Sequence, residues 1–318
     1  MAQIPPSESR LASKPGSRRV GCILFLVAGL LILGAGGYLL AGILGVHIPG
    51  FNGLSSQPPI TTTSLHITTS YRGADITIIS TQQAAGFQDD PNTASDGMVR
   101  LKLLANNATT TAITWDYSSA AALLVPGKGG VAPVYGQFLV SLAPGKSQTN
   151  ILDFPVPSNL AVSQLALRLG SANEAQLAIP LKPNASASSF QPKTTPLNGV
   201  LLYFGLNYTL KSAATGLSIP GQQAARGMLF LTLTISVDNT LSQEAIPGSP
   251  FTYARLKTGN STLAPLSSTL PVSFQTGAAG VTGTITFLVS QKSASFSLIF
   301  LPQPHDSGDQ ASTIFSLA

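Results

Sequence analysis

The sequence predicts an all-β protein in which two tandem antiparallel β-sandwiches follow one N-terminal transmembrane helix. Three observations predict this architecture. One uncharged apolar run, residues 20–46, is long enough to cross a membrane. Beyond it, apolar and small polar residues alternate in short runs, separated by turn residues roughly every 8–12 positions. Two later blocks of nearly equal length also carry the same series of motifs.

The composition excludes several classes of protein. The chain has 318 residues, of which 9% are charged, with 17 basic and 12 acidic side chains, three His and one Cys. One cysteine cannot form an internal disulfide, and so few His and Cys argue against a structural zinc site. The excess positive charge lies mainly in residues 1–19. Because no basic stripe remains to follow a phosphate backbone, we expect no nucleic-acid partner.

Residues 20–46, VGCILFLVAGLLILGAGGYLLAGILGV, are the predicted transmembrane helix. As a helix they would extend about 40 Å, more than a hydrocarbon core of roughly 30 Å. Basic residues precede this run, whereas the first Lys or Arg after it is Arg72. The positive-inside rule therefore predicts a cytoplasmic tail over 1–19 and an extracytoplasmic remainder, in a single-pass cell-membrane protein. A cleaved signal peptide is the alternative, but its apolar region is usually shorter.

Small residues follow one another at four-residue spacing in the predicted helix, at Gly37, Ala41 and Gly45. Such rows let two membrane helices approach closely, which predicts a homo-oligomer formed through this face. The competing interpretation is that glycine is simply frequent in membrane helices.

Two Pro-, Ser- and Thr-rich segments divide the part beyond the helix. Residues 47–63 are predicted to be an extracellular spacer, and residues 182–198 a linker. Between and after them lie the two predicted β-sandwich domains, 64–181 and 199–318, each long enough to bury its own core.

The two blocks follow one plan. Each begins with an alternating stretch, HITTSYRGADITIIS in the first and GVLLYFGLNYTLKS in the second, interpreted as an early strand. Each continues with a long strand that starts at Gly-Met and ends in Asn, GMVRLKLLANN and GMLFLTLTISVDN. Asn suits the turn that follows, because its side chain bonds nearby backbone. The order of matches predicts a duplication.

An aromatic pair follows the long strand in each block. Trp115 and Tyr117 match Phe251 and Tyr253. Spacing by two along a strand predicts that both rings of each pair lie on one sheet face, in the core. A carbohydrate-stacking platform is the alternative for Trp115 and Tyr117 if their rings are exposed.

Three more motifs follow in the first block. The first is a Leu-x-Pro-Gly-x-Ser turn, formed by Leu142, Pro144, Gly145 and Ser147. A Phe-x-Val-Pro strand comes next, with Phe154, Val156 and Pro157, and then Leu-x-Leu-x-Leu at 165–169. This order resembles bacterial extracellular immunoglobulin-like domains of unknown function, which are similar to a mycobacterial secreted immunogenic protein. The resemblance implies immunoglobulin-like sandwiches with a binding or envelope role, and it supplies no catalytic residues. The second block departs from it, with Gly280 to Gly283 in place of the Pro-Gly turn.

One acidic loop is the candidate metal site. QDDPNTASDG places Asp89, Asp90, Asn92 and Asp96 together, and Ca²⁺ takes six to eight oxygen ligands of this kind. The spacing is not that of an EF-hand, and a solvated loop between strands is the competing interpretation. We expect no other cofactor.

No catalytic constellation is visible. The nucleophile-elbow motif is absent from the sequence, and the one cysteine, Cys22, lies in the predicted membrane helix. We therefore expect no enzyme activity, but a non-catalytic surface module that binds an envelope polymer or a neighbouring protein. One alternative is a membrane-anchored envelope hydrolase that uses loop carboxylates or a loop metal. Another is a sensor subunit that signals through the membrane helix of a partner.

Overall fold

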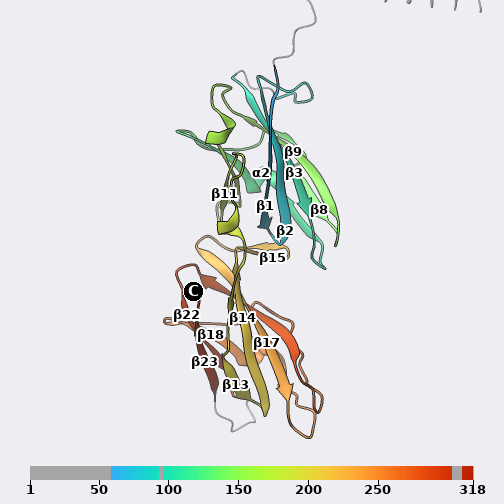
Figure 1. Ribbon diagram of the computed structural model, residues 1–318, viewed down its shortest axis with the longest axis vertical. Helices are drawn as coiled ribbons and strands as arrows, with labels where there is room; N and C mark the ends of the chain where they lie inside the picture. The colour runs from blue at the N-terminus through green and yellow to red at the C-terminus, as the bar shows by residue number, and fades with distance from the viewer. Residues whose placement is uncertain (1–58, 93–95, 303–309, 318) are drawn as a thin grey trace, which may run out of the picture. The chain divides into compact units, whose positions relative to one another are not determined.

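The computed structural model describes residues 59–92, 96–302 and 310–317. This part of the chain is all-β and built from several antiparallel sheets, which confirms the predicted fold class at that level (Figure 1). Residues 58–318 form one compact unit. They contain two large hydrophobic cores, one from residues 65–187 and one from residues 201–315. We call the surrounding segments, 59–190 and 191–317, the N-terminal half and the C-terminal half.

The N-terminal half contains two main sheets. Figure 1 shows β1, β2, β3 and β9 side by side in the larger one. Its strands, in spatial order, are β1 (Thr61–Tyr71), β2 (Ala74–Ala84), β3 (Met98–Asn106), β9 (Ser147–Pro155) and β7 (Tyr135–Gly136). The smaller sheet has the order β11 (Leu177–Pro180), β10 (Ala166–Leu169), β5 (Ala121–Val125) and β6 (Gly129–Val131). Buried side chains from both sheets form one core, as in a β-sandwich.

Short elements complete this half. β4 (Ile113–Asp116) pairs with β8 (Leu139–Leu142), and α2 (Tyr117–Ala120) follows β4 directly. Asp116 caps α2 by accepting a hydrogen bond from the backbone N–H of Ser118. The 3₁₀ turns are η1 (Val162–Gln164) and η2 (Ser188–Phe190).

The C-terminal half repeats this arrangement. Its larger sheet contains β12 (Lys193–Pro196), β14 (Leu206–Gly216), β17 (Met228–Asn239), β21 (Val281–Ser290) and β20 (Ser267–Ser268), with β13 (Val200–Tyr203) also paired to β14. The smaller sheet has the order β19 (Ser261–Leu263), β18 (Ala254–Thr258), β22 (Ser295–Phe300) and β23 (Ala311–Ser316). The remaining elements are α3 (Pro250–Tyr253) and the hairpin of β15 (Ser218–Ile219) with β16 (Gln222–Gln223).

The repetition extends to strand register. Asp75 opposes Asn106 in the N-terminal half, and Asn207 opposes Asp238 in the C-terminal half. Each pairing then shifts at the same place, between Ile78 and Ser80 and between Leu210 and Ser212. Because a one-residue slip would turn every side chain to the other face, matched bulges mean matched inward faces. The structure therefore confirms that the two halves follow one plan.

The turn-forming asparagines behave as expected. Asn107 accepts a hydrogen bond from Thr109 N–H, and Asn239 accepts one from Leu241 N–H, each at 2.9 Å. Both side chains are buried and donate to backbone carbonyls, those of Leu142 and Phe274 among them. The predicted local backbone bond is confirmed in both halves.

Each predicted early strand is instead a hairpin. Arg72 and Gly73 turn the chain between β1 and β2, and Phe204 and Gly205 do so between β13 and β14, all four with positive φ. Two successive residues with positive φ give the type I′ turn, whose twist matches that of paired strands. The alternating pattern continues across such a short turn, so alternation alone did not reveal it.

The aromatic pairs are not arranged as predicted. Trp115 lies on β4 and Tyr117 in α2, both buried, but Phe251 and Tyr253 both lie in α3, and Phe251 is 47% exposed. A helical turn separates side chains two apart by about 200°, so one faces the core and the other solvent. The prediction that both Phe251 and Tyr253 fill the core was therefore wrong for Phe251.

The predicted connectors are partly strand. Thr61–Thr63, at the end of the predicted 47–63 spacer, belong to β1, and residues 193–196 of the predicted 182–198 linker form β12. Both pair with the next long strand of their half. Residues 20–46 lie outside the described residues, and within those residues no helix is long and apolar enough to span a membrane.

Candidate functional site

The acidic loop lies between β2 and β3, and an arginine binds its first carboxylate. Arg100, on β3, donates from Nη2 to Asp89 Oδ1 at 2.7 Å, which lowers the pKa of the Asp89 carboxyl. Asp90 is buried and accepts a hydrogen bond from Asn92 N–H at 2.7 Å. The backbone carbonyl of Asp96 accepts from Ser158 N–H. These bonds fasten the loop to the end of the larger sheet.

Sequence reasoning missed Arg100 and Asp153, which oppose each other on β3 and β9. Arg100 Nε and Nη2 each donate to an Asp153 carboxylate oxygen at 2.7 Å, and its guanidinium lies over the ring of Phe87. Burial raises the pKa of Asp153, which Arg100 opposes, and the bond to Asp153 raises the pKa of Arg100. Two opposite charges on neighbouring strands can be recognised as a pair only when the register of the strands is known, and the sequence alone does not give that register.

The predicted calcium site receives no support from this geometry. Within residues 59–92, 96–302 and 310–317, no group of three or more His, Cys, Asp or Glu is placed to hold a metal ion. One loop carboxylate, Asp89, instead binds the Arg100 guanidinium, together with Asp153 of β9. Calcium binding by Asp89, Asp90, Asn92 and Asp96 therefore stays a prediction from the sequence.

The other residues predicted for a site either lie outside the described residues or are buried. Gly37, Ala41 and Gly45 lie outside the described residues. Trp115 is buried between Tyr71 and Tyr117, with edge-to-face ring contacts at centroid distances of 6.0 Å and 5.6 Å. Such rings fill the core and are not open to a sugar, so the stacking-platform interpretation is excluded for them.

The two halves meet at a built junction, which the sequence did not predict. The β1–β2 turn contacts the β15–β16 hairpin: Gly221 N–H donates to Arg72 O at 2.8 Å, and the hydroxyls of Ser70 and Ser218 are 2.9 Å apart. A Cβ added at Gly73 would lie 2.7 Å from backbone atoms of Pro220. Because real Cβ atoms do not approach so closely, the contact requires glycine at this turn.

A second set of contacts between the two halves lies beside the first. The segment from Asn173 to Gln176 pairs with residues 223–226, where Ala175 N–H donates to Ala224 O at 2.7 Å and Arg226 N–H to Asn173 O at 2.9 Å. Ala175 and Ala224 also pack with Phe230 in a small apolar cluster. The junction thus combines backbone hydrogen bonds with apolar burial.

Glu174 is the centre of a charged network on the N-terminal side of the junction. Its carboxylate accepts hydrogen bonds from Arg72 Nη2 at 2.6 Å, Tyr71 Oη at 3.0 Å and Ser171 N–H at 2.9 Å. Burial alone would raise the pKa of Glu174, but these donors together lower it below its ordinary value. Burial is the main cause that raises the pKa of Tyr71, and the nearby Glu174 carboxylate is the second. The Tyr71 hydroxyl therefore stays protonated and donates its hydrogen bond.

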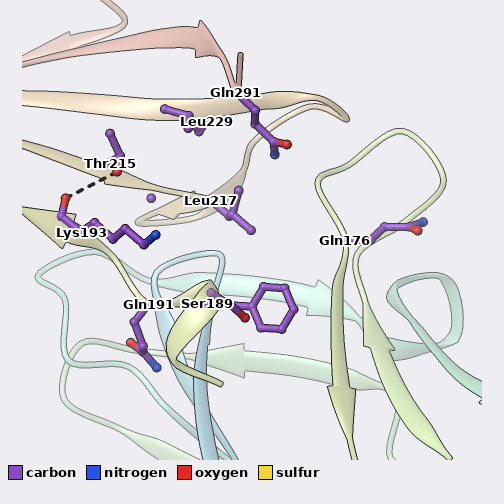
Figure 2. A pocket seen from close by; sticks show the side chains of 10 residues that line it. Gln176, Ser189, Gln191, Lys193, Thr215, Leu217, Leu229 and Gln291 are labelled. Atoms are coloured by element: carbon purple, nitrogen blue, oxygen red, sulfur yellow. Dashed lines mark hydrogen bonds between the residues drawn. The ribbon is translucent and has the colours of Figure 1, made fainter. Parts of the chain in front are cut away.

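A cleft of about 380 Å³ opens beside this junction, and we call it the junction cleft (Figure 2). Residues of both halves line it. The lining side chains that carry hydrogen-bonding groups are those of Gln176, Ser189, Gln191, Lys193, Thr215 and Gln291. Its apolar lining consists of Phe190, Leu217 and Leu229. Its volume is at the lower end of the roughly 300–1,000 Å³ typical of ligand pockets.

Sheet pairing and a 3₁₀ turn position the cleft residues. Lys193 and Thr215 are direct partners of β12 and β14, and the Thr215 hydroxyl donates to Lys193 O at 3.5 Å. η2 contacts β1, and Gln191 Nε2 next to it donates to Thr68 O at 3.1 Å. Figure 2 shows the Lys193 side chain extending between Thr215 and Gln191. No motif marks this site, because its residues are far apart in the sequence and some lie in the predicted linker.

Comparisons with known proteins add little. No protein-family model matches the chain, and no curated protein matches it. Among solved structures, the crystal structure of the conserved domain protein from Bacillus anthracis matches 81% of this chain and 92% of its own, at 7% identity and a TM-score of 0.21. A match at that TM-score supports no conclusion about fold or function.

Proposed function

We propose that the protein is a non-catalytic, single-pass membrane protein that presents two extracytoplasmic immunoglobulin-like β-sandwich domains. In this proposal an envelope polymer or a neighbouring protein binds in the junction cleft. The cleft is the observation that carries the proposal, because hydrogen-bonding side chains there surround an apolar wall, as in ligand sites generally.

Two further observations support the finer parts of the proposal. Each half has a larger and a smaller antiparallel sheet with buried side chains between them, which is consistent with the immunoglobulin-like resemblance of the motifs around Pro144 and Phe154. The uncharged run at 20–46 supports an anchor with the halves outside the membrane. In this proposal the first domain begins with β1 and the second with β12.

Site-specific photocrosslinking in intact cells tests the proposal. A benzophenone amino acid replaces Ser189, which is exposed and lines the cleft, or Thr114, which is exposed on β4 and does not. After irradiation we expect an envelope component attached at position 189 only, on a chain that stays in the membrane fraction. No product at 189, or the same product from both positions, would contradict binding in the cleft.

A further inference from the structure

The junction cleft has the chemistry of a site for an acidic sugar. We propose that it binds an anionic saccharide, with the negative group on Lys193, hydroxyl groups on the glutamine amides and a C–H face of the ring on the leucines. This inference rests on the proposed function, because it names the class of ligand for the same cleft.

The charge of the cleft favours an anion. Lys193 is its one charged residue, and none of the residues that line it is Asp or Glu. The ion pairs recorded for residues 59–92, 96–302 and 310–317 involve Arg72 and Arg100, and none involves Lys193. A ligand carboxylate would give this ammonium group a charge-assisted hydrogen bond.

The amides of the cleft favour hydroxyl groups. Gln176, Gln191 and Gln291 each donate from Nε2 to a backbone carbonyl, at 3.0, 3.1 and 3.1 Å. Each bond fixes the orientation of its amide, whereas no hydrogen bond recorded for the described part of the chain uses the amide oxygen. An oriented amide with an open oxygen and a second N–H matches a hydroxyl, which both donates and accepts.

The apolar lining favours a ring over a small free acid. Leu217, directly after β14, and Leu229 on β17 are half-buried, as is Phe190 on η2. These side chains contribute apolar surface of the kind that covers the C–H face of a ring, while the polar groups specify its orientation. A simple inorganic anion would leave this surface in contact with water.

Calorimetric titration of the full chain, in a mild detergent, tests the inference with two tetrasaccharides of similar size. Tetragalacturonate carries carboxylates, and maltotetraose is neutral. We expect binding of tetragalacturonate that weakens with added salt, as for any exposed charge pair. The variant K193M keeps the length of the side chain without its charge, and we expect about tenfold weaker binding.

The variant K211M is the matched control, because Lys211 is an exposed lysine on β14 that does not line the cleft. We expect its affinity to equal that of the unmodified chain. Equal binding of both tetrasaccharides, binding of maltotetraose alone, binding of neither, or no effect of K193M would overturn the inference. If crosslinks from position 189 persist in that case, the proposed function stands and only the ligand class is wrong.

Discussion

At the level of single residues, the ion pair between Arg100 and Asp153 shows how a buried carboxylate is kept charged within the larger sheet of the N-terminal half. The Asp153 side chain is 0% exposed and both of its oxygens accept from the guanidinium. A second carboxylate, Asp89, binds the same guanidinium. Removing one partner would leave the other charge buried and unpaired, which is far more costly than the net value of the pair.

We expect R100M to lower the free energy of unfolding by about 3–5 kcal/mol, because Asp153 would then lack its partner. Chemical unfolding of the full chain measures this loss. K102M is the control, because Lys102 lies on the same strand but is exposed, and its loss should stay within about 0.5 kcal/mol. Equal losses in the two variants would show that the ion pair contributes nothing specific.

At the scale of elements, the same turn occurs in both halves but meets different neighbours. Arg72–Gly73 and Phe204–Gly205 share a backbone conformation. A Cβ at Gly73 would meet the backbone of Pro220 from the other half, whereas one at Gly205 would meet the side chain of Leu241 from its own half. The repeat therefore specifies the hairpin, and its surroundings decide whether the hairpin joins the two halves.

Alanine at Gly73 is expected to destabilise the chain more than alanine at Gly127. Both glycines have φ near +75°, so both substitutions carry a backbone strain of roughly 1–2 kcal/mol. A Cβ at Gly127 meets nothing within 4 Å, whereas one at Gly73 is forced against Pro220, which adds about 1–3 kcal/mol. Chemical unfolding of G73A and G127A compares them directly, and equal losses would refute a tight β1–β2 turn contact with Pro220.

At the scale of the whole molecule, two separate cores are coupled through the junction. Backbone hydrogen bonds and an apolar cluster connect the halves, and the Glu174 network holds together the N-terminal segments that make these contacts. Contacts that both halves lose together make their unfolding cooperative. The chain is therefore more than two independent domains on a flexible linker.

We expect the described part of the chain to unfold in one calorimetric transition, with equal calorimetric and van't Hoff enthalpies. E174A removes the acceptor of three hydrogen bonds within the N-terminal half, which hold the segments around Arg72 and Ala175 that contact the other half, and should divide this transition into two. E244A is the control, because Glu244 also accepts a side-chain hydrogen bond, from Gln275, but in a part of the C-terminal half that makes none of the junction contacts. Two transitions in the unmodified chain would contradict the coupling.

Local patterns along the chain were enough to predict the class of fold and its repetition. Alternating residues such as those of GMVRLKLLANN and GMLFLTLTISVDN predicted strands, and the asparagines after them predicted turns, because these signals depend on local backbone preference. The repeated order of motifs predicted that both halves share one plan. Where a local preference changed, as at α3 with Phe251, the alternation rule gave the wrong face.

The contacts of the charged and polar residues, in contrast, follow from the three-dimensional fold. Asp89 of the acidic loop binds Arg100, Glu174 binds Arg72 beside the junction, and residues assigned to a linker line the cleft. Each of these depends on which distant strands are neighbours and in what register. Local sequence specifies a strand and its two faces, but the neighbours of a side chain follow from long-range pairing, which no short pattern contains.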